Sequence, residues 1–296
     1  MRTRFRPDRQ LVVRMGATMF LLGLLYVAFA AALIVLLKSL ALIVVILGAL
    51  LVAQYWYSDK IALAALHGHV VGEEESPDLH AIVDRLCATA NLPKPRVAVA
   101  DLDLPNAFAT GRDARHAVVC VSTGLMRRLD GQELEGVIAH ELAHVAHRDV
   151  VVITVAAFLG VLAGLVMRTA LYSQLLGGRQ RDQNMLLILA AVAVVSAVVY
   201  AISFLLIRTL SRYRELAADR DGALLTGRPS ALASALVKIS GDSARIPTRD
   251  LRGAQAFNAI FFSPVGGQWS VFATHPSLQR RLDELEKIAV QLGGSA

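Results

Sequence analysis

The sequence predicts a mostly α-helical, membrane-embedded fold, in which four transmembrane helices are combined with a soluble α/β domain that carries a small edge sheet. Three observations lead to this fold class. Hydrophobic residues make up 55% of the 296 residues, and charged residues make up only 18%. Four apolar runs are each long enough to cross a bilayer as a helix. The segments between and after them contain short β-rich stretches and helical patterns.

The four apolar runs are the candidate membrane spans. Met15–Leu37 and Met185–Ile207 each contain 23 residues without a charge, and Leu40–Tyr57 and Val150–Met167 each contain 18. A helix of about 20 residues crosses a hydrocarbon core of about 30 Å. Buried helices of a soluble core are the alternative, and this alternative is stronger for the two 18-residue runs than for the two longer ones.

Positive charges indicate the orientation of these spans. Five arginines precede the first run and three follow the last, whereas the predicted outer loop Tyr172–Asn184 carries Arg179 and Arg181. Because cytoplasmic flanks carry the excess of basic residues, both termini are predicted in the cytoplasm. These flanking arginines also account for much of the net charge of +6, so no nucleic-acid partner is expected. The predicted parts are a cytoplasmic N-terminus and first hairpin (1–57), a cytoplasmic part (58–149), a second hairpin (150–207) and a second cytoplasmic part (208–296).

Local patterns predict the elements of the first cytoplasmic part. Ser76 and Pro77 have the residue types of a helix start, and this helix runs to about Ala90. Extended stretches follow at Arg96–Asp101, Asn106–Gly111 and His116–Ser122, with a turn at Gly111–Ala114. Asp130 and Glu133 then have the spacing of a capping box, so another helix begins there and is expected to continue into the third span.

This last helix carries the segment HELAHVAHRD, residues 140–149. Residues four apart share one face of a helix, so the imidazoles of His140 and His144 can bind one metal ion. Glu141 lies beside them, where it can take a proton from the water that attacks a substrate. Two histidines and a glutamate in this pattern are typical of a zinc-dependent hydrolase.

A catalytic zinc site needs a third protein ligand, and two candidates are present. His147 is near in sequence, but it lies two helical turns from His140, which argues against a shared ion. Glu215 and Asp219 are four apart in the helical pattern of Ser211–Leu225. Glu215 would bind the metal, and Asp219 would hold the far nitrogen of a ligand histidine. A solvated charged helix face is the alternative, because arginines surround both carboxylates.

These motifs resemble those of the HtpX-type membrane zinc metallopeptidases, which are relatives of the Ste24-type CAAX prenyl proteases. The resemblance rests on HELAH (140–144), ELAAD (215–219), PNAFATG (105–111) and THPSLQRRL (274–282), and on the hairpin between the two metal motifs. It implies a zincin-like α/β catalytic domain that faces the cytoplasm and binds one Zn²⁺ per chain. It also implies an endopeptidase that degrades damaged or misassembled membrane proteins.

The same resemblance implies two further groups of site residues. The strand that contains Asn106, Ala107 and Phe108 would lie along the edge of the cleft and pair with an extended substrate, with the Asn106 side chain near the scissile bond. His275 and Arg281 would stabilise the oxyanion or orient the substrate. The alternatives are a turn asparagine at 106 and a loop histidine that caps the final helix at 275.

The sequence therefore predicts a zinc endopeptidase of the cytoplasmic membrane, with His140, His144 and Glu215 as ligands and Glu141 as general base. The expected partners are peptide or membrane-protein substrates and the lipid bilayer, and homo-oligomer formation stays open. One alternative is a CAAX-type prenyl protease, although the better-known members of that family carry more spans. The other is a non-catalytic membrane scaffold with a structural zinc site, in which Glu141 would have no use.

Overall fold

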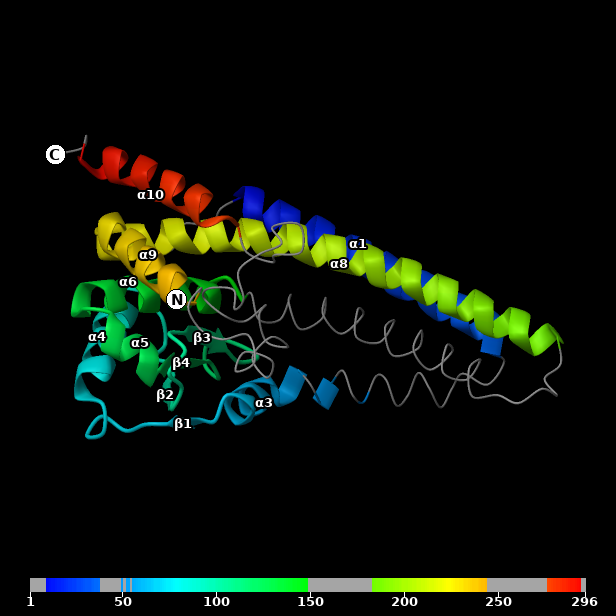
Figure 1. Ribbon diagram of the computed structural model, residues 1–296, viewed down its shortest axis with the longest axis horizontal. Coiled ribbons are helices and arrows are strands. Elements are labelled where there is room, and N and C mark those ends of the chain that lie inside the picture. The colour runs from blue at the N-terminus through cyan, green and yellow to red at the C-terminus, as the bar shows by residue number, and fades with distance from the viewer. Residues whose placement is uncertain are drawn as a thin grey trace. The chain divides into compact units, whose positions relative to one another are not determined.

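A computed structural model describes residues 9–37, 49, 52–53, 55–148, 183–243 and 276–293. The chain divides into two compact units, and each is considered by itself. Unit 1 consists of Met1–Leu11, Trp56–Val151 and Ser211–Ala296, and unit 2 consists of Val12–Tyr55 and Val152–Leu210. Helices predominate, and a small mixed sheet lies in unit 1, in agreement with the predicted mostly α-helical class (Figure 1).

The sheet of unit 1 has the strand order β1-β2-β4-β3, so β3 lies at one edge. β2 and β4 are parallel, whereas β1 pairs with β2 and β3 pairs with β4 in antiparallel fashion. The three extended stretches predicted from the sequence are confirmed as β2, β3 and β4. The short strand β1 was not predicted. The bounds are β1 Gly68–Val70, β2 Arg96–Ala100, β3 Ala107–Thr110 and β4 Val118–Ser122.

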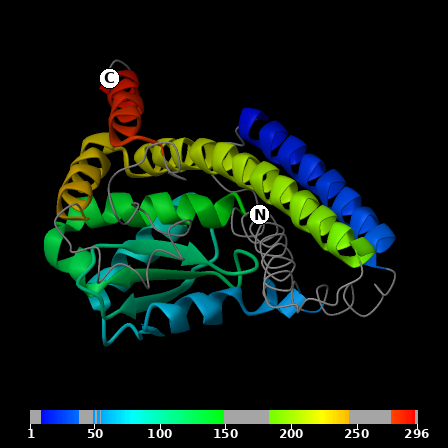
Figure 2. The same ribbon diagram turned by 45° about the vertical axis from the view of Figure 1, so that its right-hand side comes forward.

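Both faces of the sheet are covered by helices, because apolar residues occupy alternate positions on both sides of each strand. Val99 and Val121 face the larger core, which they share with α4 (Pro77–Ala90) and α6 (Gly131–Ala146). Phe108 and Cys120 belong to a smaller core with α3 (Ser58–Ala65) on the opposite face. Figure 2 shows the sheet between α6 and α3. The helix α4 begins after Ser76 and ends at Ala90, as predicted.

The N-terminus of α6 is fixed by the predicted capping box. The Asp130 side chain accepts hydrogen bonds from the N–H groups of Gln132 and Glu133, and the Glu133 carboxylate accepts one from the Asp130 N–H. Ser234 and Lys238 also reach this carboxylate, at 2.6 and 2.7 Å, from α9 (Pro229–Ser243). Glu133 therefore ties the start of α6 to a second helix.

The expected continuation of α6 into the third span is wrong. The helix ends at Ala146, and Arg148 has a φ of 57°, which lies in the left-handed region. The sequence pattern shows no break there, because apolar residues resume at Val150 and neither glycine nor proline interrupts the segment.

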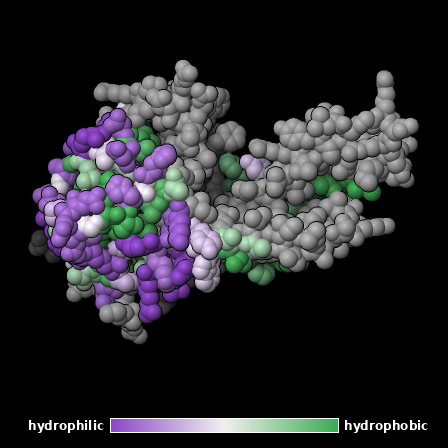
Figure 3. Space-filling model, turned by 90° about the horizontal axis from the view of Figure 1, so that it is seen from below, coloured by the Kyte–Doolittle hydropathy of each residue, from purple (hydrophilic) through white to green (hydrophobic). Residues whose placement is uncertain are grey.

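The remaining helices of unit 1 complete its core. The short helix α5 (Thr123–Arg128) follows β4 directly. Leu236 and Ile239 of α9 and Leu285 and Ile288 of α10 (Leu278–Gly293) are buried in the same core as α6. Figure 3 shows mostly hydrophilic residues on the coloured surface of unit 1, with hydrophobic residues gathered between them. This surface is that of a domain exposed to water.

Unit 2 contains α1 (Arg9–Leu37) from Val12 onward and the first part of α8 (Gln183–Thr226), which lie side by side in both ribbon views (Figures 1 and 2). Buried residues of α8 recur with a spacing of three or four, at Val192, Ser196, Val199 and Ser203. Large apolar residues such as Phe20 and Leu205 are exposed. A helix with an apolar exposed face needs an apolar environment or another partner.

Within the described residues, one helical stretch, Ala190–Thr226, is long and apolar enough to cross a membrane, and Gly16–Phe29 forms a shorter apolar helix. The predicted run Val150–Met167 and most of Leu40–Tyr57 lie outside the described residues. The predicted set of four spans is therefore not confirmed by the structure.

The capping box leads to a prediction about stability. Glu133→Ala should lower the free energy of unfolding by about 2 kcal/mol, because it removes the N3 half of the capping box and leaves Ser234 and Lys238 without this partner. Glu284→Ala is the matched control, because it removes an exposed ion pair with Lys287. Thermal unfolding of the full chain in detergent should show a lower midpoint for Glu133→Ala alone. Equal midpoints for the two variants would contradict this role of Glu133.

Candidate metal centre

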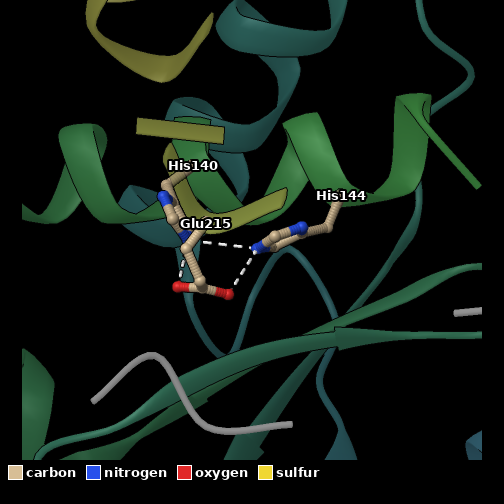
Figure 4. Close-up of side chains that lie close together, drawn as sticks. All are labelled: His140, His144 and Glu215. Atoms are coloured by element: carbon tan, nitrogen blue, oxygen red, sulfur yellow. Dashed lines mark hydrogen bonds and ion pairs between the residues drawn. The ribbon is translucent and has the colours of Figure 1, made fainter. Parts of the chain in front are cut away.

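The helix α6 presents three functional side chains to one buried region of unit 1. His140 and Glu141 are 0% and 3% exposed, and His144 is 9% exposed. Glu215, which is also buried, comes from the part of α8 that belongs to unit 1. Figure 4 shows the imidazoles of His140 and His144 and the carboxylate of Glu215 pointing toward one another. The structure thus brings together the three ligands predicted from the sequence.

The distances in this cluster fit a single metal ion. The Nε2 atoms of His140 and His144 are 3.1 Å apart. Glu215 Oε1 lies 3.5 Å from His144 Nε2, and Glu215 Oε2 lies 3.7 Å from His140 Nε2. Ligand atoms about 2.0–2.1 Å from a tetrahedral ion are about 3.3 Å from one another. The cluster can therefore hold a metal ion, with one carboxylate and two imidazole ligands.

Asp219 determines how His140 presents its ring. Its Oδ1 lies 3.0 Å from His140 Nδ1, and both side chains are buried. A proton on Nδ1 shared with this carboxylate leaves the Nε2 lone pair directed at the cluster, as a metal ligand requires. Burial lowers the pKa of His140 to about 4, although Asp219 opposes this shift. The imidazole is therefore neutral at neutral pH, which is the form that binds metals.

Arg281, from α10, contacts the carboxylates of Asp219 and Glu215. Its Nε and Nη2 donate hydrogen bonds to the two oxygens of Asp219, at 2.7 and 2.6 Å. Its Nη1 lies 3.7 Å from Glu215 Oε2. The family resemblance implies that Arg281 stabilises the oxyanion or orients the substrate, and in the structure this guanidinium is 3% exposed and faces Asp219 and Glu215. His275, its predicted companion, lies outside the described residues.

Glu141 lies between the metal ligands and the edge strand. Burial raises its pKa to about 7, and the charge of Glu215 acts in the same direction. The Ala109 N–H of β3 donates a hydrogen bond to the Glu141 carboxylate. The contact of Ala109 with Glu141 was not predicted from the sequence. The alternation of apolar residues identifies a strand, but it does not show whether that strand lies at the edge of the sheet. A buried carboxylate with a raised pKa is suited to proton transfer near neutral pH.

The three predicted substrate residues lie at the start of β3. Asn106 is buried, and its backbone N–H and carbonyl bond to Ser122, at 2.9 and 2.8 Å. The side chains of Ala107 and Phe108 are buried in the two cores, on opposite faces of the sheet. Ala107 can therefore meet a substrate only through its backbone, which points away from β4, whereas the backbone groups of Phe108 face Cys120 of β4.

His147, the alternative third ligand, points elsewhere. Its Nε2 lies 3.0 Å from Asp221 Oδ2, which connects the end of α6 to α8. The metal-ligand group found among the described residues consists of His140, His144 and Glu215. The geometry therefore favours Glu215 over His147.

Comparison with known proteins agrees with this site. The family model described as Peptidase family M48 matches residues 73–289. Protease HtpX homolog 1 of Streptomyces coelicolor is 66% identical over 297 residues, which cover 99% of this chain and 97% of that protein. A protease HtpX homolog of Moorella thermoacetica is 48% identical and covers 99% of both chains.

The fold also resembles that of a protein of known structure with low sequence identity. The crystal structure of Ste24p from S. mikatae superposes with a TM-score of 0.53 at 17% identity, covering 94% of this chain and 67% of that chain. The resemblance inferred from four sequence motifs is confirmed by the family match and by relatives that align over the full chain. The chain belongs to peptidase family M48, as an HtpX-type metalloprotease, and it shares its fold with Ste24p.

Proposed function

We propose that this chain is a zinc endopeptidase of the cytoplasmic membrane that cleaves damaged or misassembled membrane proteins. The observation that carries the proposal is the buried cluster of His140, His144 and Glu215, with Glu141 beside it. Two imidazoles and one carboxylate suit zinc better than magnesium or calcium, which prefer oxygen ligands alone. Three protein ligands also leave the fourth position open, as in catalytic zinc sites.

When bound at this cluster, a zinc ion supplies a Lewis acid that polarises a carbonyl and makes water more acidic. The residues of the chain perform the remaining tasks. Glu141 takes the proton of the attacking water and returns it to the leaving amine, which its pKa of about 7 permits at neutral pH. Asp219 keeps His140 in the ligand tautomer, and Arg281 holds both carboxylates in place.

The outer edge of β3, with which no strand of the described residues pairs, is the proposed docking edge for substrate. A peptide in extended conformation would pair with the outward-facing backbone of β3 at Ala107, next to Phe108, whose own backbone groups face β4. The Asn106 side chain would lie close to the scissile bond. The hydrogen bond from Ala109 to Glu141 supports this arrangement, because it brings the edge and the general base together. Backbone pairing selects for unfolded segments and tolerates many sequences, which suits a protease that removes damaged proteins.

The proposed membrane topology has four spans, with both termini and the catalytic unit in the cytoplasm. The exposed apolar residues of α1 and of the first part of α8 support a lipid environment for unit 2. Eight arginines next to the first and last apolar runs support the orientation. The relatives named above are HtpX-type proteases, so a prenyl protease is not favoured. The complete set of base and ligands argues against a structural zinc site.

The first prediction of this proposal concerns the metal ligands. Glu215→Ala should abolish stoichiometric zinc binding, because it removes one of three protein ligands. His147→Ala should leave zinc binding nearly intact, since His147 contacts Asp221 outside the cluster. Asp219→Asn should weaken zinc binding by about 10–100-fold, as do other substitutions of residues that hydrogen-bond to a metal ligand. Zinc content of the purified variants measures all three, and loss of zinc in His147→Ala with retention in Glu215→Ala would reverse the ligand assignment.

A second prediction separates chemistry from binding. Glu141→Gln keeps the size of the side chain but removes its proton acceptor. Zinc content should stay at the wild-type level, whereas peptide cleavage should fall by about 10²–10⁴-fold. Both quantities are to be measured on the same sample. Normal cleavage at full zinc content would exclude a general-base role, and loss of zinc would assign Glu141 to the structure of the site.

A third prediction concerns orientation in the membrane. Glu74→Cys and Val290→Cys should resist a membrane-impermeant thiol reagent in intact cells and react after lysis, whereas Gly178→Cys should react in intact cells. The native Cys87 and Cys120 are buried, which raises their pKa values to about 11 and about 12, so background labelling should be low. Labelling of Glu74→Cys in intact cells would reverse the proposed topology.

A further inference from the structure

The contact between α6 and the end of α8 leaves no room for a side chain at Gly222. A Cβ atom at this position would lie 2.9 Å from the backbone nitrogen of His140 and 3.2 Å from its Cα. It would also lie 3.3 Å from the carbonyl carbon of Ala139. These are backbone atoms of a helix, so they cannot rotate away as a flexible side chain would. At Gly222, α8 therefore packs directly against the backbone of His140, one of the proposed metal ligands.

The backbone conformation of Gly222 does not require glycine. Among the described residues, the glycines with positive φ are Gly111 and Gly227, and Gly222 lies within the helix α8. In a helix interior, glycine is less favourable than alanine by about 1 kcal/mol. Alanine would therefore favour the helix itself, and the contact with His140 is what opposes it.

The same face of α8 carries the residues that complete the site. Glu215, Asp219 and Gly222 follow one another at spacings of four and three, so they share one face of the helix. Ala218 of α8 and Ala143 of α6 also belong to one buried cluster, and each is 0% exposed. Small residues at the crossing allow the backbones to approach closely, and this approach brings both carboxylates within reach of α6.

We propose that Gly222 is a positioning residue of the metal centre, which sets the distance between α6 and α8 that zinc binding requires. The inference rests on the proposed zinc site. Asp219 lies 3.0 Å from His140 Nδ1, and Glu215 lies 3.5 Å from His144 Nε2. A larger residue at 222 must move α8 or α6, and that movement lengthens both distances at once. Zinc affinity should therefore depend on a residue that has no ligand atom.

The chain offers a matched control in Gly136. This glycine also lies inside α6, and a Cβ atom there would lie 3.3 Å from backbone and side-chain atoms of Leu232 in α9. Gly136→Ala thus introduces a milder crowding between two helices of the same unit, because the nearest contact is 3.3 Å rather than the 2.9 Å found at Gly222. It acts on the contact with α9, however, and leaves the contact of α6 with α8 unchanged.

The test compares Gly222→Ala, Gly222→Val, Gly136→Ala and Glu215→Ala in the full chain. Zinc affinity is measured by competition with a chromophoric chelator, and the visible absorption of the Co²⁺-loaded protein reports the geometry of the site. Gly222→Ala should weaken zinc binding by about 10–100-fold and alter the Co²⁺ spectrum, and valine should do more. Gly136→Ala should match wild type in both measurements. Melting temperatures in excess chelator report the stability of the metal-free fold.

Three results would overturn the inference. One is a zinc affinity of Gly222→Ala equal to that of the wild type. Another is a loss of zinc affinity in Gly136→Ala as large as that in Gly222→Ala, which would show general damage to packing. The third is failure of Gly222→Ala to fold in excess chelator, which would make Gly222 a requirement of the fold rather than of the site. Retention of zinc by Glu215→Ala would instead refute the proposed ligand set itself. The two failures are therefore distinguishable.

Discussion

The hydrogen-bonded pair of His140 and Asp219 is the constraint on which the metal centre depends. Neither residue can be buried without its partner, because an isolated carboxylate in a dry interior is very costly and an unpaired imidazole N–H also loses solvation. Asp219 in turn needs Arg281, which supplies two further hydrogen bonds. A chain of three polar side chains therefore connects α6, α8 and α10. The side chains of the proposed ligands are therefore held in position by a buried polar network.

This network explains why the catalytic unit is built around α6. The capping box fixes where the helix begins, and Glu133 ties that beginning to α9. The core between the sheet and α6 fixes the rotation of α6 about its axis, because Val137, Ile138 and Leu142 are fully buried there. With start and rotation both determined, His140 and His144 can face only one direction. Precise placement of ligands is thus a consequence of ordinary helix capping and core packing.

Much of the site could be predicted from the sequence, because it depends on local spacing. The pairs His140–His144 and Glu215–Asp219 are four residues apart, and a helix places such pairs on one face whatever the rest of the fold is. The partner of Arg281 could not be predicted this way. Its contact with Asp219 spans 62 residues of sequence, and only the packing of α10 brings the two together. Contacts between elements follow from tertiary packing, which a local pattern does not encode.

The same difference accounts for the errors in the fold. The strands β2 and β4 were predicted because each contains five residues rich in valine, whereas β1 has three residues and no pattern of its own. The end of α6 was missed because no glycine or proline marks it. Arg148 adopts the left-handed conformation, for which arginine has no preference, so the surrounding structure imposes it. Short elements and helix ends of this kind are determined by neighbours.

The order of the ligands along the chain has a consequence for biosynthesis. His140 and His144 precede the apolar runs 150–167 and 185–207, and Glu215 follows them. A nascent chain that has been synthesised only as far as α6 therefore contains two proposed ligands and the proposed general base. It contains neither Glu215 nor Asp219. Arg281 emerges later still, near the C-terminus. On the proposed ligand assignment, a growing polypeptide has an incomplete metal site until the segment that contains Glu215 has been made.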